Sequence, residues 1–393
     1  MTLWARGEDR PDEPARPMLL ALDGDGLIHR AHHGMVAALG EVSADRDADG
    51  RPTWALRGLV TSLAVAAARL RPDAVVVALD SRVDPVRKAK YPDYKAHRPP
   101  REPDLQEQLD AAPGLLADGG VPHACVEGHE GDDVLASAAA GARAAGWGCV
   151  VVTSDRDAFA LVDATTSVLR VVDGGVDAGP LLTPRSIEAL CGVPPSGYRD
   201  LAALRGDPSD NLPGVPGVGA KTAARLLRAF GSAREVFAAL DDGRAGDVEA
   251  AVGTACVARL AEPGARAAVD RNLDLMAMRE DLPLPDLART RLPLHSDRLL
   301  AALRARGIAL GPSLWALVGG EPPPWEPNGF DKAPATLPAV SSPPWALGSP
   351  LPTLAELAAR RQSGRRDEPA AKARPARRTR VAPAVPAGQL SLF

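Results

Sequence analysis

The sequence predicts an α/β protein with a parallel sheet, followed by a helical region and then by a tail without stable structure. Two observations predict this order. Over roughly the first 190 residues, short unbroken apolar runs alternate with Ala- and Leu-rich stretches, as buried parallel strands and their covering helices require. After about residue 319, prolines and alanines replace the large aliphatic residues, so too little apolar surface remains to form a core.

Three apolar runs are expected to be strands of this sheet, and each is followed by an acidic residue. They are Met18–Leu22 before Asp23, Ala74–Leu79 before Asp80, and Cys149–Ser154 before Asp155. The stretches Thr53–Leu70 and Asp132–Ala145 contain few helix breakers and are expected to be helices. Ligands of parallel sheets bind beyond the carboxyl ends of the strands, which is where these acids fall.

Five acidic clusters in all end an expected strand or begin an expected helix. They are Asp23, Asp80, the run Glu130, Asp132 and Asp133, the pair Asp155 and Asp157, and the pair Asp207 and Asp210. Mg²⁺ takes oxygen ligands, and two such ions held close together need several carboxylates from separate parts of a fold. Any one of these acids could instead cap a helix or end a strand. Together they predict a two-metal site that cleaves phosphodiester bonds.

A glycine-rich turn over residues 206–219 leads into an expected helix. Its backbone N–H groups can point together at one phosphate, and the glycines allow that phosphate to approach closely. A P-loop would need Gly-Lys-Ser/Thr in direct succession, whereas Ala220 stands between Gly219 and Lys221. A helix–hairpin–helix turn that holds the DNA backbone is therefore expected. Its DNA-binding residues are expected to be Gly214, Gly217, Gly219, Lys221 and Thr222.

These motifs together resemble the 5′ nuclease family, that is, the N-terminal 5′-3′ exonuclease domain of bacterial DNA polymerase I and its flap endonuclease relatives. The resemblance covers about residues 18 to 318 in the family's order. The matching segments are Leu22-Asp-Gly-x-x-Leu-x-x-Arg30, Asp93-Tyr-Lys-Ala-His-Arg-Pro-Pro100, Glu130-Gly-Asp-Asp-Val-Leu-Ala136, Thr153-Ser-Asp-Arg-Asp157 and Gly206-Asp-Pro-Ser-Asp-Asn-Leu-Pro-Gly214.

The resemblance implies a PIN-like parallel-sheet nuclease core and a structure-dependent 5′-3′ exonuclease or flap endonuclease of DNA replication and repair. It implies two Mg²⁺ ions, with Mn²⁺ as a substitute. Around the first ion it places Asp23, Asp80, Glu130, Asp132 and Asp133, and around the second Asp155, Asp157, Asp207 and Asp210. It also implies that Arg87 and Lys95 meet the scissile phosphate and that Arg30, Tyr94 and Arg98 contact DNA.

The same resemblance divides the chain into parts. It implies a flexible extension over 1–17, the nuclease domain over 18–190, the helical helix–hairpin–helix domain over 191–318 and a disordered basic linker over 319–388. Within the first domain, residues 81–112 contain five prolines and several cations and correspond to the arch that covers a single-stranded 5′ end. An ordinary exposed loop is the alternative for this segment.

The sequence departs from the family in one helix. His29, His32 and His33 stand where Phe or Tyr is expected, and Val86 replaces an aromatic residue before Arg87. Because carboxylates supply the expected metal site, we expect surface or supporting roles for the three histidines.

Composition limits the remaining possibilities. No apolar run is long enough to span a membrane and no secretory segment is evident, and the four cysteines show no metal-type spacing. We therefore expect a cytoplasmic protein, and a monomer. The formal charge of −4 is low for a DNA-binding protein, but bound cations would offset part of the acidic cluster. The tail leaves no room for a polymerase domain, which predicts a free-standing nuclease.

The last five residues resemble the peptide with which bacterial replication and repair proteins bind the β sliding clamp. The expected anchors are Gln389, Leu390, Leu392 and Phe393. An apolar peptide after a long depleted linker is typical of a docking segment.

Two other functions remain open. A PIN-type ribonuclease would share the acidic core but has no need for the helix–hairpin–helix segment, which favours DNA. A non-catalytic adaptor that binds DNA structures would be indicated by a missing metal-binding acid, and every expected acid is present.

Overall fold

The computed structural model describes residues 16–39, 45–83, 85–173, 175–310 and 314–321. Its main sheet has the strand order β3-β2-β1-β4-β5-β6, in which the first five strands are parallel and β6 is antiparallel to β5. The strands are β1 (Met18–Asp23), β2 (Ala74–Leu79), β3 (His123–Cys125), β4 (Gly148–Thr153), β5 (Thr166–Arg170) and β6 (Leu181–Leu182).

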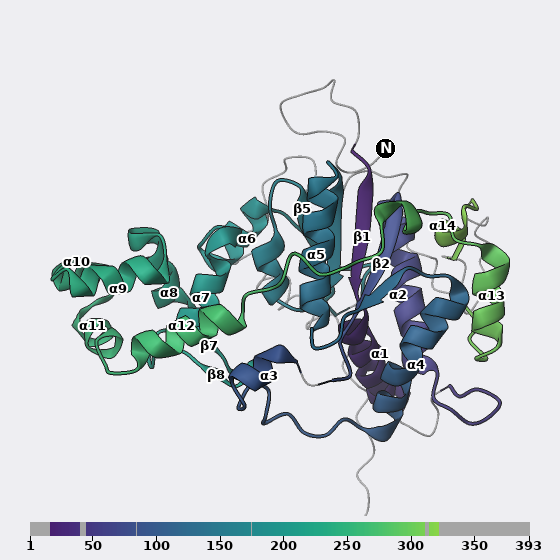
Figure 1. Ribbon diagram of the computed structural model, residues 1–393, viewed down its shortest axis with the longest axis horizontal. Helices are drawn as coiled ribbons and strands as arrows, with labels where there is room; N and C mark the ends of the chain where they lie inside the picture. The colour runs from purple at the N-terminus through teal and green to yellow at the C-terminus, as the bar shows by residue number, and fades with distance from the viewer. Residues whose placement is uncertain (1–15, 40–44, 84, 174, 311–313, 322–393) are drawn as a thin grey trace, which may run out of the picture. The chain divides into compact units, whose positions relative to one another are not determined.

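Helices cover both faces of this sheet (Figure 1). Alternate residues of β1 point to opposite sides, so Leu20 and Leu22 belong to one core and Leu19 and Ala21 to the other. Helices that pack in the first core are α1 (Gly24–Leu39), α2 (Trp54–Leu70), α4 (Pro103–Gly119), α13 (Ser296–Arg304) and α14 (Trp315–Val318). The second core holds α5 (Gly131–Ala144), the 3₁₀ segment Asp157–Leu161 and part of α6 (Pro184–Cys191).

The predicted fold class is confirmed in the described part of the chain. The three expected strands are present within one residue of their predicted bounds, because their apolar runs are buried between the two layers of helices. The two expected helices are α2 and α5, each also within one residue of its prediction. No helix of the described residues is both long and apolar enough to cross a membrane.

A second, helical region follows the sheet and has its own core (Figure 1). It is built from α7 (Tyr198–Arg205), α8 (Ala220–Phe230), α9 (Ala233–Asp241), α10 (Ala245–Val252), α11 (Thr254–Leu260) and α12 (Ala265–Leu275). Between α7 and α8 lies a short hairpin of β7 (Gly206–Asp207) and β8 (Leu212–Pro213). This hairpin carries one of the predicted acidic pairs toward the sheet.

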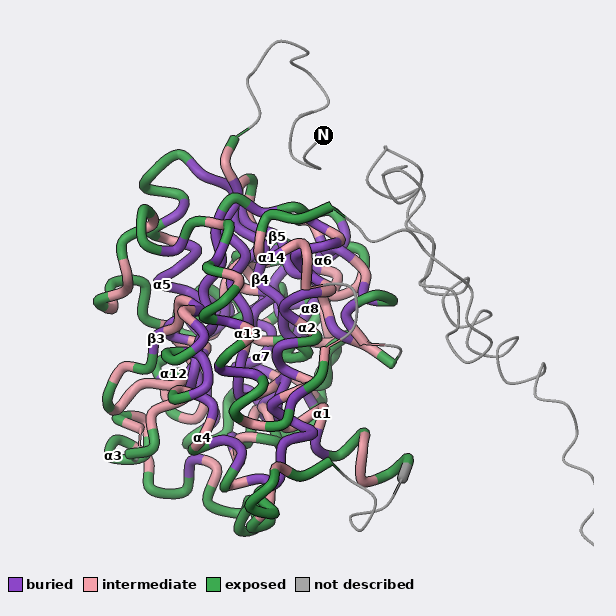
Figure 2. Tube along the Cα trace, turned by 90° about the vertical axis from the view of Figure 1, so that its right-hand side faces the viewer, coloured by how far each residue is buried: buried purple, intermediate pink, exposed green. Residues whose placement is uncertain are grey.

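The predicted arch segment is shorter than expected. Helix α3 (Val86–Lys90) has no buried residue (Figure 2), and turns and irregular backbone follow as far as Glu102. Helix α4 then begins at Pro103, because Leu105 and Leu109 are buried against the first core. The irregular stretch therefore ends before residue 103, and the last part of the predicted arch, as far as residue 112, is helical. The predicted linker beyond residue 321 and the predicted clamp peptide lie outside the described residues.

Candidate active site

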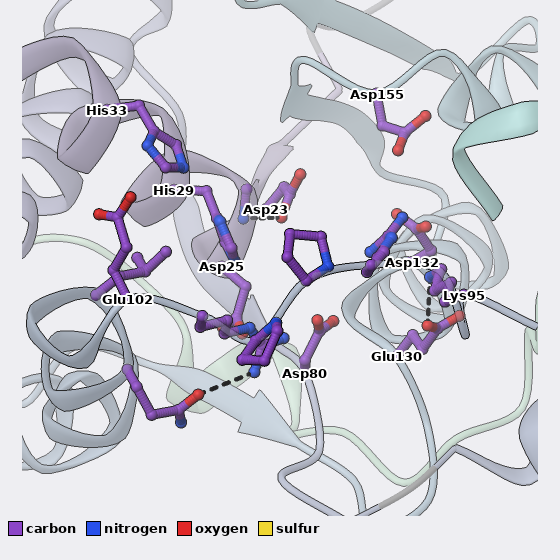
Figure 3. A pocket seen from close by; sticks show the side chains of 17 residues that line it. Asp23, Asp25, His29, His33, Asp80, Lys95, Glu102, Glu130, Asp132 and Asp155 are labelled. Atoms are coloured by element: carbon purple, nitrogen blue, oxygen red, sulfur yellow. Dashed lines mark hydrogen bonds and ion pairs between the residues drawn. The ribbon is translucent and has the colours of Figure 1, made fainter. Parts of the chain in front are cut away.

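The parallel strands bring three of the predicted acids to one edge of the sheet. Asp23 ends β1, Asp80 follows β2 and Asp155 follows β4, and β1 lies between β2 and β4. Asp132, in the first turn of α5, faces the same space. The start of α5 is held beside β2, because the N–H of Gly131 donates to Asp80 Oδ1 at 2.7 Å. These four carboxylates line a pocket of about 740 Å³ (Figure 3).

Asp23 is held in place by neutral donors alone. Thr153 Oγ1 donates to one of its carboxylate oxygens at 2.7 Å, and the N–H of Gly26 donates to the other at 2.8 Å. Burial, and then the charges of Asp80 and Asp155, raise the pKa of Asp23 to about 7 against these two hydrogen bonds. Among the described residues, no cationic side chain pairs with this carboxylate.

A second acidic group lies beside the first. Burial, and then the charges of Asp155, Asp207 and Asp210, raise the pKa of Asp157 to about 7. Asp132 lies between the two groups, since burial and then Asp155, Asp23 and Asp157 raise its pKa well above the ordinary value. The two sets of carboxylates that the sequence predicted are therefore close enough to repel each other.

The arch segment bonds directly to the acids. Lys95 donates to Glu130, and Tyr94 Oη donates to Glu130 at 2.8 Å and to Asp210 at 3.1 Å. Arg98 donates to the other oxygen of Asp210 at 2.8 Å. Burial raises the pKa of Glu130, but the charges of Lys95 and Arg87 outweigh it and leave the pKa lowered.

The backbone of the same segment is fixed against the hairpin. The N–H of Lys95 donates to the carbonyl of Asp210 at 3.0 Å, and Asn211 Nδ2 donates to the carbonyl of Asp93 at 2.8 Å. Lys95 has φ = 56°, an uncommon conformation for a residue with a side chain. Such conformations persist where surrounding contacts fix them, and they are frequent at functional sites.

Two predictions for individual residues need correction. Asp133 is fully buried and does not line the pocket; both of its oxygens accept from Arg87, at 2.7 Å each. The remaining Arg87 donors bond to Glu130 and to the carbonyls of Leu275 and Ala277. Asp133 is thus placed as a partner of Arg87 and not as a metal ligand, and the one Arg87 donor that reaches a pocket residue bonds to Glu130.

The three residues predicted to contact DNA near the active site have different surroundings in the structure. Tyr94 is only 4% exposed, so its ring is in the core and only its hydroxyl reaches the acids. Arg30 does not line the pocket and donates to the carbonyl of Val172. Arg98 does line the pocket. DNA contact by Arg30 stays a prediction, and the buried ring of Tyr94 does not support stacking on a base.

One further acidic residue of the pocket was not predicted from the sequence. Asp25 is 4% exposed and pairs with Arg82, which also donates to the carbonyl of Leu109 at 2.7 Å and contacts Asp110. Burial, and then the charge of Asp80, raise the pKa of Asp25 to about 6 against the opposing effect of Arg82. Its spacing of two residues from Asp23 was the available signal.

The glycine-rich turn separates into two parts. Gly217 has φ = 79°, is exposed and has open space around it, while Val215 and Val218 on either side are buried in the helical core. Gly219, Lys221 and Thr222 follow at the start of α8. Gly214, in contrast, lies against the backbone: an added Cβ would come within 2.3 Å of the Gly206 nitrogen. Its predicted role at a phosphate is replaced by close packing of the hairpin.

Two family models match this chain in succession. Residues 18–189 match the N-terminal resolvase-like domain of 5′-3′ exonucleases, and residues 193–295 match the C-terminal SAM fold of the same enzymes. The chain belongs to the 5′-3′ exonuclease family. The two matched ranges correspond to the sheet with its covering helices and to the helical region.

Curated relatives agree with this membership. A 5′-3′ exonuclease of Streptomyces coelicolor is 36% identical over 315 residues, which cover 76% of this chain and 98% of that protein. The DNA polymerase I of Mycobacterium bovis is 35% identical over 301 residues, covering 76% of this chain and 31% of the polymerase. The chain therefore spans about a third of the length of the polymerases that it matches.

Solved structures of one phage enzyme share the fold. The flap endonuclease of bacteriophage T5, in a complex with DNA and metal ions, has a TM-score of 0.50 at 21% identity and covers 66% of this chain and 88% of its own. The T5 5′-exonuclease with bound zinc has a TM-score of 0.51 at 19% identity, covering 73% and 97% of the two chains. At this level of identity the similarity concerns the fold alone.

Proposed function

We propose that this protein is a metal-dependent 5′-3′ exonuclease and flap endonuclease that hydrolyses phosphodiester bonds in DNA. The observation that carries the proposal is the shared pocket. Carboxylates from two groups face it, and Lys95 and Arg98 line the same cavity. Family membership supports the same reaction class. Cations above clustered acids suit a substrate that is a polyanion and a site that needs metal.

The acidic residues fit divalent cations by their chemistry. All the donors are carboxylate oxygens, which hard ions prefer. Burial, and then the repulsion between these carboxylates, raise the pKa values of Asp23, Asp132 and Asp157. A bound cation would remove that repulsion. We propose two Mg²⁺ ions, with Mn²⁺ as a substitute. The first would be held by Asp23, Asp80, Asp132 and Glu130, the second by Asp155, Asp157, Asp207 and Asp210.

The protein groups have separate tasks in this mechanism. When bound, the two ions supply a water of lowered pKa and neutralise charge on the leaving oxygen. Thr153 and Gly26 orient Asp23 through their hydrogen bonds. Lys95 and Arg98 line the pocket and place positive charge where the scissile phosphate would enter. No side chain has to act as a nucleophile.

Arg87 is proposed to position the active-site carboxylates through its buried contacts. Its buried pair with Asp133 connects α3 of the arch to the N-terminus of α5, which carries Asp132. Its bonds to the carbonyls of Leu275 and Ala277 extend the connection to the end of α12. The group thus fixes the two parts of the fold whose carboxylates must converge.

DNA would be held by the turn before α8 in addition to the pocket. Gly217 and Gly219 are exposed, and the space around them is open to a phosphate. Lys221 and Arg225 on α8 are exposed beside them. Because these contacts reach only the sugar-phosphate backbone, binding is proposed to depend on DNA structure and not on sequence. Double-strand contact at this turn favours DNA processing over the ribonuclease alternative.

Further parts of the proposal depend on the sequence alone. We propose that Gln389, Leu390, Leu392 and Phe393 bind a β sliding clamp, which would bring the nuclease to sites of DNA replication and repair. Both acidic groups and the arch come from one chain, so the proposed active form is a monomer. The four cysteines are free thiols, which suits the proposed cytoplasmic location.

Cleavage of defined substrates tests the proposal. Labelled 5′-flap, nicked and single-stranded DNA, and an RNA of the same sequence, would be incubated with the protein, with EDTA or with added Mg²⁺. We expect metal-dependent products from the 5′ end of the flap and nicked DNA. Cleavage of the RNA alone would support the ribonuclease alternative, and DNA binding without cleavage would support the adaptor.

A further inference from the structure

Helix α1 carries a histidine cluster beside the active-site pocket. His32 is 1% exposed, and its ring stacks on Trp54 with centroids 5.4 Å apart. His33 is exposed, and its ring meets that of His32 edge-on at 5.1 Å. Of the two roles expected for these histidines, a surface position fits His33, whereas His32 is buried and packs in the first core of the sheet.

A carboxylate completes this cluster from the end of the arch. His32 Nε2 lies 2.7 Å from Glu102 Oε2, and Glu102 precedes the first residue of α4. One ring nitrogen from each of His32 and His33 and a carboxylate oxygen of Glu102 all lie within 4.8 Å of one another. Two imidazoles and a carboxylate are a donor set that zinc sites use, with a fourth position open to water.

This cluster is separate from the proposed Mg²⁺ ligands. His33 and Glu102 lie at one end of the pocket, while Glu130, Asp132 and Lys95 lie at the other (Figure 3). The donors also differ in kind, because the acidic site offers oxygen alone and this one offers two nitrogens. Imidazole favours Zn²⁺ and its neighbours Co²⁺ and Ni²⁺ over Mg²⁺.

We propose that His32, His33 and Glu102 form a second metal site, selective for Zn²⁺-like ions. Metal–ligand bonds of 2.0–2.2 Å would bring the donor atoms to about 3.4 Å from one another, closer than they lie here. The two exposed groups, His33 and Glu102, supply that movement, since the side chain of Glu102 is 52% exposed. His32 is fixed by its stacking and sets the position of the ion.

Some neighbours of the cluster favour a bound cation and others disfavour it. Within the described residues, His32 Nδ1 is buried and has no hydrogen-bond partner, whereas Glu102 can accept a proton from Nε2, so a metal ion at Nε2 would have to displace that proton. Asp104 contributes negative charge near Glu102. Arg98 and Arg101 line the same pocket and oppose a cation, although Arg101 donates to Gln106 at 3.3 Å. The site should accordingly bind with moderate affinity, well below that of closed zinc sites.

A metal at this position would connect two parts that must separate or adjust for substrate. His32 and His33 belong to α1, whereas Glu102 ends the irregular arch segment. Coordination by all three would fix the end of the arch to α1. A bound ion would therefore control access to the pocket, and its binding does not depend on the proposed nuclease activity.

The experiment measures Co²⁺ and Zn²⁺ binding to the full chain in millimolar Mg²⁺, by titration calorimetry and by the visible absorption of bound Co²⁺. The variants are His33→Ala and Glu102→Gln, which avoid the buried His32. The control is His295→Ala, an exposed histidine that does not line the pocket. DNA is absent, so the outcome is independent of cleavage.

We expect one Co²⁺ site with tetrahedral-type absorption that Zn²⁺ displaces and Mg²⁺ does not. Its affinity should fall at least tenfold in His33→Ala and Glu102→Gln and stay unchanged in His295→Ala. An Asp155→Ala variant should keep the site. Equal Co²⁺ affinity in His33→Ala, Glu102→Gln and the control His295→Ala would overturn the proposal. Displacement of Co²⁺ by millimolar Mg²⁺ would also overturn it, because the ion would then belong to the acidic pocket.

Discussion

Arg87 donates to both carboxylate oxygens of Asp133 at 2.7 Å each, and the pair is almost completely buried. Removing one member of such a pair leaves an uncompensated charge in the interior, which is more costly than removing both. The pair joins the arch to the helix that carries Asp132. Its loss should therefore also displace the carboxylates of the active site.

Arg87→Ala should therefore lower the free energy of unfolding by about 3–5 kcal/mol, the typical cost of breaking a buried pair. Denaturant unfolding would measure the change. The double variant Arg87→Met with Asp133→Leu, which removes both charges of the pair, should recover a large part of it. An Arg87→Ala protein as stable as the unaltered chain but inactive would instead place Arg87 at the substrate, as the family resemblance implied.

Gly217→Val should weaken binding to nicked or flapped duplex DNA, by about tenfold if one phosphate contact is lost. The added side chain would occupy the open space at the turn and strain a backbone with φ = 79°. Gly243→Val is the matched control, because Gly243 has φ = 75° and equally open surroundings. Binding would be followed by fluorescence anisotropy in a salt titration, and equal affinities for the two variants would exclude this turn as a DNA contact.

The stability of the metal-free protein should fall as the pH rises from 6.5 to 8.5. The pKa values of Asp23 and Asp157 are raised to about 7 in the folded state, above the ordinary value of 3.8, so both groups stabilise the fold when protonated. That contribution is complete below pH 4 and is lost between pH 4 and the folded-state pKa near 7, at up to about 1.4 kcal/mol per pH unit for each group, so its last part is lost above pH 6.5 and the curve levels off by pH 8.5. His29, with its pKa lowered to about 4 mainly by burial, acts in the opposite direction only below this range.

Mg²⁺ should accordingly raise the melting temperature more at pH 8.5 than at pH 6.5, because the carboxylates that bind it are then ionised. Calorimetric scans with EDTA and with Mg²⁺ would measure the difference. Asp23→Asn should flatten the pH dependence of the metal-free protein, and Asp297→Asn, an exposed acid outside the pocket, should leave it unchanged. A metal-free stability that rises over this range would contradict the assignment.

Deletion of residues 389–393 should abolish binding to a β sliding clamp and leave cleavage of free oligonucleotides unchanged. A docked peptide depends on a few apolar anchors, whereas catalysis depends on the pocket. Surface plasmon resonance with immobilised clamp, beside a cleavage assay, would compare the full and shortened chains. Shortening the segment between residues 320 and 355 is the control, since it should leave clamp binding intact. Equal clamp affinity after the deletion would rule recruitment by this peptide out.

The sequence predicted the sheet and the edge at which the acids meet because both depend on local signals. The apolar runs Met18–Leu22 and Ala74–Leu79 are buried strands, and the acid after each must lie beyond the sheet. The sequence could not distinguish Asp132 from Asp133. Adjacent residues of a helix point about 100° apart, and which one faces the pocket depends on how α5 packs.

Other features depended on contacts between distant residues. Arg87 is held by carbonyls nearly 190 positions later, and no local pattern indicates such partners. The start of α4 at Pro103 follows from the burial of Leu105 and Leu109, which the prolines before it concealed. His32 is buried because Trp54 of the next helix stacks on it, a contact that helix periodicity alone does not reveal.

The most direct test of the central claim is cleavage of a 5′-flap DNA by Asp155→Ala, with Asp297→Ala as the control. Asp155 is exposed at the pocket and its charge contributes to the raised pKa values of Asp23, Asp132 and Asp157, so it lies close to both acidic groups. In Mg²⁺, we predict that Asp155→Ala loses cleavage by at least a hundredfold while it keeps its fold and its affinity for the flap. The control should cleave normally. Turnover at the unaltered rate by Asp155→Ala would contradict the two-metal account.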